Sequence, residues 1–564
     1  MKIYLALALL IFSFITVAQV QQDKYIITLK NKTTSDFSLS RPEQFLSAKA
    51  IERRKKHGIA ISASDMPVVS SYIEAITSTG AKVIYQSKWL NIIIVEVTGS
   101  DFANRMPSLP FVTSIHVFND NKSSALKKTA VKPFFQNESF QSVSSSNSLK
   151  SGENNASYDY GSAFNQINML SGNQLHDLGF KGQGITIAVI DAGFNSVDVL
   201  HAFDSLWANN QILGTHDFVQ PNNNVFNTGI SSHGMMVLST MGANMSGQIV
   251  GTAPKSSYWL LRSEDATAEY IMEEYFWVNA AEYADSVGAD IINSSLGYTV
   301  FDDTLQNHTY ADMNGNTTVI TIGADLAAQK GILVVNSAGN SGSDTDPWKY
   351  ISAPADGDSV FSIGAVDSQG NRAFFSSKGP TYDGRIKPNI AAQGMGTAVA
   401  NLSGGVSFGN GTSFSSPIIA GMSACLWQAN VSMSNMDIIN ALQKSGSQAT
   451  NPDTLLGFGI PNYMTANVIL STNEHYFSNN RSDVNILPNP FFDGFTVDFL
   501  SRSQKGTVNT TLKTVSGLTV YNGSYSMNGS KRLTINNLPN LASGIYILFI
   551  QSGNTEWVKK VIKY

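Results

Sequence analysis

The sequence is poor in cysteine, in charge and in long apolar runs. Cys425 is the single cysteine among 564 residues, so the chain cannot form an internal disulfide framework. Charged side chains make up 14% of the residues and the formal net charge is -5, which gives no basic footprint for nucleic acid. Beyond residue 18 no stretch is long and apolar enough to span a bilayer, so we expect no transmembrane segment in the mature chain. Cys425 is expected to be a small buried hydrophobe.

The first 18 residues have the pattern of a secretory signal peptide. Lys2 precedes an apolar run over residues 5–18, and the small residues Thr16 and Ala18 stand before Gln19. The run is too short to cross a membrane. We therefore expect residues 1–18 to direct export.

A serine at the start of a helix is the first candidate for chemistry. Gly411-Thr412-Ser413 stands where a glycine-rich loop passes into a helix of small residues, predicted over residues 418–426. A hydroxyl there lies beside unpaired backbone N–H groups and the positive end of the helix dipole, which suits a site that stabilises an oxyanion. Pro417 is expected in the first helical turn, where its missing N–H costs nothing. Taken alone, Ser413 would be an ordinary N-cap.

Two upstream segments favour a nucleophile instead. Residues 184–193 form an apolar run containing Asp191 near its end, which predicts a buried parallel strand with a carboxylate at its C-terminal end. His233 opens a predicted helix that continues to Gly242. The order Asp191, His233, Ser413 matches one of three chain orders known for a catalytic triad. The other histidines are expected to be structural or solvent-facing: His57, His116, His176, His201, His216, His308 and His475.

The chain from about residue 160 to 470 resembles the subtilisin-like serine proteases. The resemblance rests on the triad and on five further segments in the same order, which are residues 251–254, 289–297, 334–340, 376–380 and 386–390. It implies an α/β fold with a doubly wound, mainly parallel sheet. We place this peptidase domain at residues 157–472.

The resemblance also implies the role of each triad member. His233 would take the proton of Ser413 as the serine attacks a peptide carbonyl, and would return it to the leaving amine. Asp191 would fix the imidazole tautomer and stabilise the imidazolium. The reaction would pass through an acyl-enzyme and needs no cofactor.

Two further segments would bind the substrate. Asn340, with the backbone N–H of Ser413, would donate to the developing oxyanion, although a plain Ala-Gly-Asn turn also explains this residue. The segment Ser295, Leu296 and Gly297 would pair with the substrate as with an added strand, the glycine allowing close backbone approach. The sequence predicts no side-chain preference for cleavage beyond a broad or apolar one.

The chain departs from the family pattern beside two triad members. Ala192 follows Asp191 where the family usually has Ser or Thr, which removes one hydrogen bond near the carboxylate. Met235 and Met236 follow His233-Gly234 where Thr and a small residue are usual. These positions support the triad and are not members of it, so we expect a divergent but active enzyme. The alternative is a catalytically inactive surface adhesin or binding protein on the same scaffold.

A compact α+β unit is predicted over residues 19–118. Residues 24–30 alternate as a strand, residues 42–57 predict a basic helix and residues 89–97 are rich in β-branched side chains. The run Arg53-Arg54-Lys55-Lys56 is expected to be a solvated helix face, because the overall charge argues against a nucleic-acid patch. A unit of this size before a subtilisin-like domain resembles the family's propeptide, a chaperone and inhibitor. Residues 119–156, rich in Ser and Asn, predict an exposed linker that is cut during maturation.

The last part of the chain predicts a small β-sandwich. Short alternating strands, such as residues 495–499 and 533–538, follow the segment Pro488-Asn489-Pro490. This start, the Gly-Ile-Tyr strand at 544–546 and the lysine-rich end resemble the sorting domain of type IX secretion. A carbohydrate-binding or spacer module is the alternative. We place the domain at residues 484–564 and expect a protein secreted through the periplasm.

The expected partners are therefore protein or peptide substrates, the chain's own propeptide and the type IX secretion machinery. No metal ligands can be named from the sequence. Structural calcium would agree with the resemblance, but Asp302-Asp303 and Asp344-Thr345-Asp346 lack a diagnostic ligand spacing, and solvated loops explain them equally well.

Overall fold

The computed structural model divides the chain into two compact units. One comprises Met1–Asp36 and Met66–Asp120, the other Phe37–Asp65 and Asn121–Tyr564. The predicted signal peptide lies outside the described residues. The structure describes residues 23–98, 101–118, 139–142, 158–220, 224–227, 231–478, 484–489, 491–500, 503–514, 518–538, 541–542, 544–553 and 555–563.

The first unit is an antiparallel sheet with two short helices. Its strands run in the order β2-β3-β1-β4, with β1 at Asp23–Leu29 and β3 at Ile92–Val97 in the middle. Buried side chains of these strands pack with residues of α2 (Ser70–Thr77) and with Phe102 of α3 (Phe102–Arg105). The edge strands are β2 (Lys82–Ser87) and β4 (Val112–Val117). The predicted α+β character of this part of the chain is confirmed.

A seven-stranded parallel sheet forms the centre of the second unit. The strand order is β14-β13-β12-β11-β6-β10-β7, and every neighbouring pair is parallel. The central strands are wholly buried, as their continuous apolar sequences predict. The strands are β6 (Thr186–Asp191), β7 (Ile212–Asp217), β10 (Ser257–Arg262), β11 (Ile291–Ser294), β12 (Leu333–Ser337), β13 (Phe361–Val366) and β14 (Ile390–Gln393).

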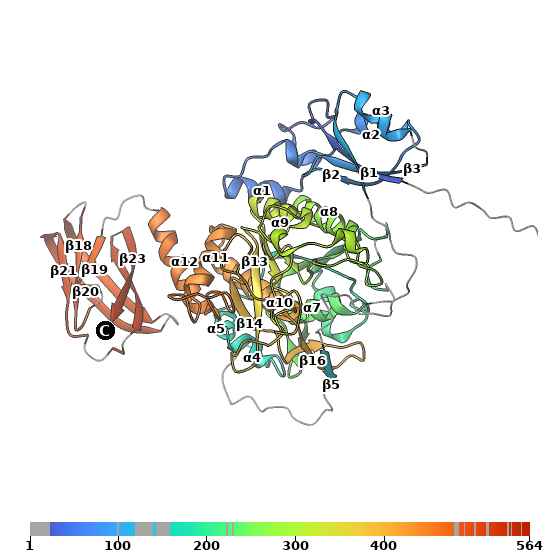
Figure 1. The fold of residues 1–564 in the computed structure, drawn as a ribbon. Coiled ribbons are helices and arrows are strands. Elements are labelled where there is room, and N and C mark those ends of the chain that lie inside the picture. Colours follow the sequence, from blue (N-terminus) through green and yellow to red (C-terminus); the bar gives the residue numbers. More distant parts are fainter. Residues whose placement is uncertain are drawn as a thin grey trace, which may run out of the picture. The chain divides into compact units, whose positions relative to one another are not determined.

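Four helices pack around this sheet (Figure 1). Helices α7 (His233–Gly242) and α10 (Thr412–Ala429) contact each other and the sheet. Helices α8 (Met272–Val287) and α9 (Val319–Gln329) form a second contacting pair. Buried side chains of α7 and α10 share one core with Ile187 of β6 and Leu333 of β12. The doubly wound α/β fold predicted from the sequence is confirmed.

Shorter elements complete this part of the chain. One of them, β5 (Ser139–Ser142), pairs with β16 and lies inside the range predicted to be an exposed linker; the rest of that range is outside the described residues. The others are α4 (Phe164–Asn168), α5 (Gly172–Asp177), α6 (Asp204–Ala208), β8 (Asn244–Met245), β9 (Ile249–Val250), β15 (Thr397–Ala400), β16 (Val406–Asn410), α11 (Asn435–Lys444) and α12 (Tyr463–Ser478).

Helix α1 (Ala48–Lys56) corrects the prediction made for its basic run. Lys55 and Lys56 are exposed, but Arg53 is only 4% exposed and Arg54 only 1%. Both arginines form ion pairs with Asp285 of α8. Only the second half of the charge run, Lys55 and Lys56, is therefore solvated. The two arginines of the first half are buried because they pair with Asp285, which is distant in the sequence.

The C-terminal strands form two antiparallel sheets that share one hydrophobic core. The three-stranded sheet has the order β17-β18-β21 and the four-stranded sheet β20-β19-β22-β23. Phe495 and Val497 from the first sheet and Leu548 and Ile550 from the second belong to the same core. This confirms the predicted small β-sandwich. Its strands are β17 (Val484–Leu487), β18 (Phe495–Phe499), β19 (Gln504–Thr514), β20 (Thr519–Ser530), β21 (Arg532–Ile535), β22 (Gly544–Ser552) and β23 (Thr555–Lys563).

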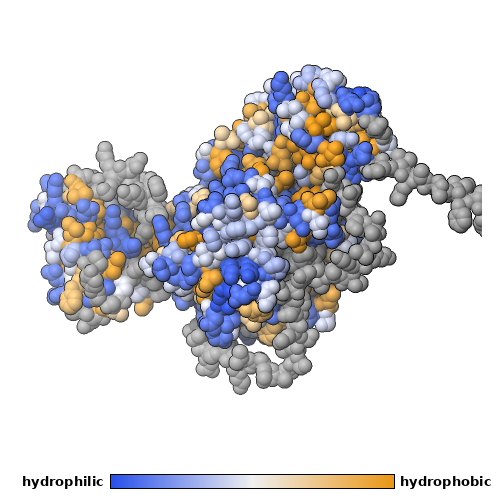
Figure 2. Space-filling view, viewed as in Figure 1, coloured by the Kyte–Doolittle hydropathy of each residue, from blue (hydrophilic) through white to orange (hydrophobic). Residues whose placement is uncertain are grey.

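The hydropathy of the surface agrees with the scarcity of long apolar runs in the sequence. Hydrophobic residues are interspersed with hydrophilic ones on the face shown in Figure 2. Within the described ranges, none of the helices has the length and hydropathy needed to cross a membrane.

Candidate active site

The ends of three neighbouring parallel strands gather the candidate residues. Asp191 is the last residue of β6, Ser295 follows the end of β11, and Asn340 comes three residues after the end of β12. Since β12, β11 and β6 are adjacent and parallel, their carboxyl ends lie at one edge of the sheet. In chain order β6 is the first strand of this sheet, and it lies where the strand order reverses, between β11 and β10. Such a reversal is the usual position of a ligand crevice.

Asp191 and His233 form a buried hydrogen-bonded pair. His233 Nδ1 lies 2.7 Å from Asp191 Oδ1, and the two side chains are 5% and 0% exposed. A carboxylate at Nδ1 holds the imidazole with its other nitrogen, Nε2, directed away. Gly234 is required here, because a Cβ on it would lie 2.5 Å from the backbone oxygen of Gly193 and 3.0 Å from Asp191 Cβ.

The departures from the family pattern have identifiable effects. The backbone N–H of Ala192 donates to Asp191 Oδ1 at 2.7 Å. Asp191 Oδ2 is buried and accepts no hydrogen bond within the described residues, which agrees with the missing hydroxyl at position 192. Met235 and Met236 are buried and belong to the core of the unit.

Ser413 lies in the first turn of α10, whose N-cap is Gly411. Its hydroxyl is buried and makes no hydrogen bond in the described part of the chain. The ring of the next residue, Phe414, lies 6.1 Å from the ring of His233. The histidine therefore packs against the turn that carries the serine.

The position of Pro417 differs from the expectation. It stands inside α10 and not in its first turn, because the helix already begins at Thr412. A proline there lacks the N–H that would bond to the carbonyl oxygen of Ser413 four residues earlier. That oxygen instead accepts a hydrogen bond from Ser295 Oγ at 2.9 Å.

Thr412 orients Asn340, a role that the sequence did not indicate. The backbone N–H and the hydroxyl of Thr412 both donate to Asn340 Oδ1, at 2.8 and 2.9 Å. The same hydroxyl accepts from the backbone N–H of Gly339 at 3.1 Å. Because Thr412 holds the Asn340 oxygen, the orientation of the side-chain amide is fixed, and its NH₂ group points away from Thr412. A threonine directly before a candidate serine is a local signal that could have suggested this contact.

The segment Ser295, Leu296 and Gly297 is fixed from behind. Asn336 of β12 donates to the backbone oxygen of Leu296 at 3.1 Å, and Ser295 holds the backbone of Ser413. All of these groups are buried. The segment is therefore tied to the backbone of Ser413, and its role in pairing with a substrate stays a prediction.

A pocket of about 170 Å³ adjoins Asn340. Trp348, Tyr350 and Val300 contribute apolar surface to it, and Asp346 and Ser352 contribute polar atoms. Sequence reasoning considered Asp346 only as part of an acidic loop and did not find the other residues, since they lie in segments without a periodic pattern. The Ser352 hydroxyl is buried and makes no hydrogen bond among the described residues.

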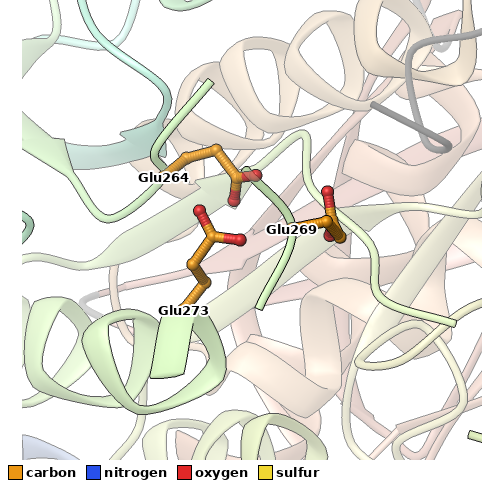
Figure 3. Close-up of side chains that lie close together, drawn as sticks. All are labelled: Glu264, Glu269 and Glu273. Atoms are coloured by element: carbon orange, nitrogen blue, oxygen red, sulfur yellow. The ribbon is translucent and has the colours of Figure 1, made fainter. Parts of the chain in front are cut away.

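Three buried glutamates form the one cluster of possible metal ligands found among the described residues. Oxygens of Glu264, Glu269 and Glu273 lie within 4.8 Å of one another, and Figure 3 shows the carboxylates of Glu264 and Glu273 facing each other. Tyr298 donates to Glu264, and the backbone N–H of Asp265 donates to Glu273 at 2.6 Å. Buried like charges at this spacing favour either a shared proton or a cation.

Carboxylate oxygens are the donors that calcium prefers, so these three side chains are the residues that could hold it. The sequence analysis did not single them out. The acidic pairs that it considered are not in the cluster, although Asp302 accepts a hydrogen bond from the backbone N–H of Glu269 at 3.2 Å. Structural calcium remains a prediction.

Comparisons with known protein families give three matches, each to a different segment of the chain. Residues 182–459 match the subtilase family, residues 24–133 match the propeptide domain of S8 peptidases from Bacteroidota, and residues 485–564 match the C-terminal sorting domain of a secretion system. These matches confirm the three resemblances drawn from the sequence. The sorting domain also confirms secretion to the extracellular space or the cell surface.

Individual relatives align with the central part of the chain. Subtilisin from Bacillus pumilus is 30% identical over 285 residues, which cover 50% of this chain and 90% of the relative. Subtilisin E from Bacillus subtilis is 30% identical over 289 residues, and the match spans 66% of its length, just under two thirds. A crystal structure of MycP1 with its N-terminal propeptide removed aligns with a TM-score of 0.43 and 22% identity over 54% of this chain and 96% of that one.

Proposed function

Because the chain belongs to the subtilase family, we propose that it is a secreted serine endopeptidase that is made as a zymogen and cleaves peptide bonds in proteins through Asp191, His233 and Ser413. The observation that carries the proposal is the buried 2.7 Å contact between His233 and Asp191, packed against the helical turn that bears Ser413. This is the geometry of a base whose orientation is fixed by a carboxylate.

The reaction follows from these positions. His233 accepts the proton of Ser413 Oγ while that oxygen attacks the peptide carbonyl carbon, and Asp191 stabilises the resulting imidazolium. Collapse of the tetrahedral intermediate transfers the proton to the leaving amine and leaves an acyl-enzyme. Water then attacks the ester by the same route in reverse, which frees the acid and restores Ser413.

Asn340 supports the proposal as a donor to the oxyanion. Its oxygen is taken up by Thr412, so the amide N–H groups are the part that a substrate oxygen meets. In subtilisin, loss of one such donor lowers turnover by roughly 10²–10³-fold. The start of α10 adds the positive end of a helix dipole at the same place.

The substrate would lie along residues 295–297 as an added strand and place one side chain in the pocket beside Asn340. The pocket's aromatic walls, Trp348 and Tyr350, favour a side chain with substantial apolar surface, and Asp346 and Ser352 offer polar partners to its far end. Placing a side chain there would bring the peptide carbonyl to the oxyanion donors.

The test is replacement of the nucleophile. Ser413→Ala should fold normally and lose casein hydrolysis by about 10⁶-fold, the size known for subtilisin. Ser423→Ala serves as the control, since this serine lies in the same helix and its hydroxyl contacts Tyr463. A serine-directed covalent inhibitor should label wild type and Ser423→Ala but not Ser413→Ala. Near-normal activity in folded Ser413→Ala would show that Ser413 is not the nucleophile. A folded wild type without any hydrolysis would favour a binding protein on this scaffold.

A further inference from the structure

Arg262 lies beside the candidate triad but is not one of its members. It is the last residue of β10, and in the parallel sheet it pairs with Asp191 of β6 on one side and with Asp217 of β7 on the other. Its side chain is only 3% exposed. An arginine is almost never removed from water unless its charge and its N–H groups have partners.

The partners of Arg262 all lie at the carboxyl ends of strands. Nη1 pairs with Asp217 Oδ2 at 2.9 Å, and the Asp217 side chain is 1% exposed. Nε donates to the backbone oxygens of Ala192 and Glu264, each at 3.2 Å. Ala192 directly follows β6 and Asp217 ends β7. One guanidinium group therefore connects the ends of β6, β7 and β10.

The contact with Ala192 bears on the carboxylate of Asp191. The backbone N–H of Ala192 donates to Asp191 Oδ1 at 2.7 Å, and the same oxygen lies 2.7 Å from His233 Nδ1. The oxygen of this peptide accepts from the backbone N–H of Ser263 at 3.1 Å. The next peptide is held by Arg262 through the Ala192 oxygen. Both peptides of Ala192 are thus bonded to the end of β10.

The same turn packs against the helix that begins at His233. The backbone oxygen of Gly193 lies so close to Gly234 that a Cβ there would come within 2.5 Å of it. A shift of the peptide between Ala192 and Gly193 would therefore disturb the first turn of α7 as well as the N–H that Asp191 accepts. The turn after β6 contacts both the carboxylate and the helix that carries the base.

Residue 192 offers the carboxylate no side-chain donor. Asp191 Oδ2 is buried and accepts no hydrogen bond within the described residues. The carboxylate is therefore oriented through Oδ1, by the backbone N–H of Ala192 and by His233. The position of the Ala192 backbone matters more in this chain than it would beside a serine or threonine hydroxyl.

We propose that Arg262 is a positioning residue for the triad. By holding the Ala192 backbone it keeps the Asp191 carboxylate directed at His233, in place of the hydroxyl that residue 192 lacks. The ion pair with Asp217 keeps the guanidinium group at this place. The effect on catalysis rests on the proposed peptidase function, whereas the effect on the contact between Asp191 and His233 does not.

That contact is tested in the full-length Ser413→Ala precursor, which needs no activity. The proton shared by His233 Nδ1 and Asp191 should give a resonance far downfield of the amide protons, because a short hydrogen bond to a carboxylate deshields it. His233→Gln identifies the signal by removing it. Arg262→Met should move the signal upfield or abolish it, since the Ala192 backbone is released.

Arg262→Met leaves Asp217 buried without its cation, which endangers folding. The double variant Arg262→Met with Asp217→Asn removes both charges, and the asparagine oxygen can still accept from the backbone N–H groups that Asp217 Oδ1 now binds. The signal should be displaced in this variant as well. An unchanged resonance in the folded double variant would overturn the proposal.

Gln211→Met is the matched control. Gln211 directly precedes β7 and is 6% exposed, and its Nε2 donates to the backbone oxygens of Pro254 and Ser256 at 3.0 and 2.6 Å. It thus connects β7 to the amino end of β10, at the edge of the sheet opposite the triad. Its loss should lower stability and leave the downfield resonance in place. An equal displacement in Gln211→Met would mean that Arg262 has only a general structural role.

Catalysis is tested in the active chain on a short peptide substrate. The double variant should lower kcat by about 100-fold and leave KM unchanged, which is the size of effect expected when a catalytic group is misplaced by about 1 Å. Gln211→Met should keep the wild-type kcat. Equal kcat values for the two would overturn the positioning role. A wild type that shows no hydrolysis would refute the proposed function, while the resonance measured in the precursor would still decide whether Arg262 holds the contact between Asp191 and His233.

Discussion

Ser295 Oγ donates a 2.9 Å hydrogen bond to the backbone oxygen of Ser413. The oxygen is available because Pro417 has no N–H to bond with it inside α10. This bond thus connects the segment Ser295–Gly297 to the helix that bears Ser413. The arrangement ties the position of Ser413 to a residue 118 places earlier in the chain.

Ser295→Ala should therefore lower kcat more than it raises KM. The buried carbonyl of Ser413 loses its donor, at a cost of about 1–3 kcal/mol in unfolding free energy, and the nucleophile is held less firmly. The control is Ser294→Ala at the adjacent position, the last residue of β11, whose hydroxyl accepts a hydrogen bond from Trp277 of α8. Kinetics on a short peptide substrate, with stability measured in the Ser413→Ala background, separates the two effects. Equal kcat values for the two variants would show that Ser295 has no positioning role.

Stability should fall as the pH decreases from about 6.5 to 4 because of His176. This side chain is fully buried, with Nδ1 2.9 Å from the hydroxyl of Tyr160 and Nε2 2.9 Å from the backbone oxygen of Thr252. Burial lowers its pKa to about 4, against the opposing effect of the Thr252 carbonyl. The unfolded chain, with a pKa near 6.5, binds the proton more readily, so protonation favours unfolding.

The free energy of unfolding should fall by about 3 kcal/mol between pH 6.5 and pH 4. Above pH 6.5 His176 should cause no such loss. Denaturant unfolding of Ser413→Ala at a series of pH values measures the slope. The variant His176→Gln in the same background is less stable overall but should have a shallower slope between pH 6.5 and 4. Parallel slopes would mean that other groups cause the acid sensitivity.

The precursor should cut itself within residues 119–156. Wild type expressed alone should yield a peptidase fragment that begins in this range, and the Ser413→Ala precursor should stay in one piece because it lacks the nucleophile. Mass spectrometry of both proteins identifies the new termini. A wild type that is fully active and uncut would contradict the zymogen hypothesis.

Deletion of residues 484–564 should change location and not catalysis. The sandwich has its own hydrophobic core, and Asp191, His233, Ser413 and Asn340 all lie upstream of it. The truncated chain should accumulate as an active peptidase in the periplasm of its native host, with its rate on a small peptide unchanged. Cell fractionation and assay of each compartment provide the measurement. Normal release of the truncated enzyme, or loss of activity, would assign the sandwich a different role.

The sequence by itself determined the elements that carry Asp191, His233 and Ser413. An apolar run that ends in a carboxylate, a histidine before a helical pattern and a serine before small residues are local signals, and the structure has β6, α7 and α10 at those places. Parallel strands place their carboxyl ends at one edge of the sheet, which the sequence also implied. That β6, β11 and β12 are neighbours was decided by the strand order of the folded chain.

Only the tertiary structure decided what depends on distant partners. Arg54 meets Asp285 across 231 residues, and a pattern of four basic side chains cannot tell which two will be buried. Glu264, Glu269 and Glu273 come together because a loop folds back on the start of α8, which no periodicity records. Local propensity and capping act over a few residues, whereas burial of charge is set by whichever surface the fold brings opposite.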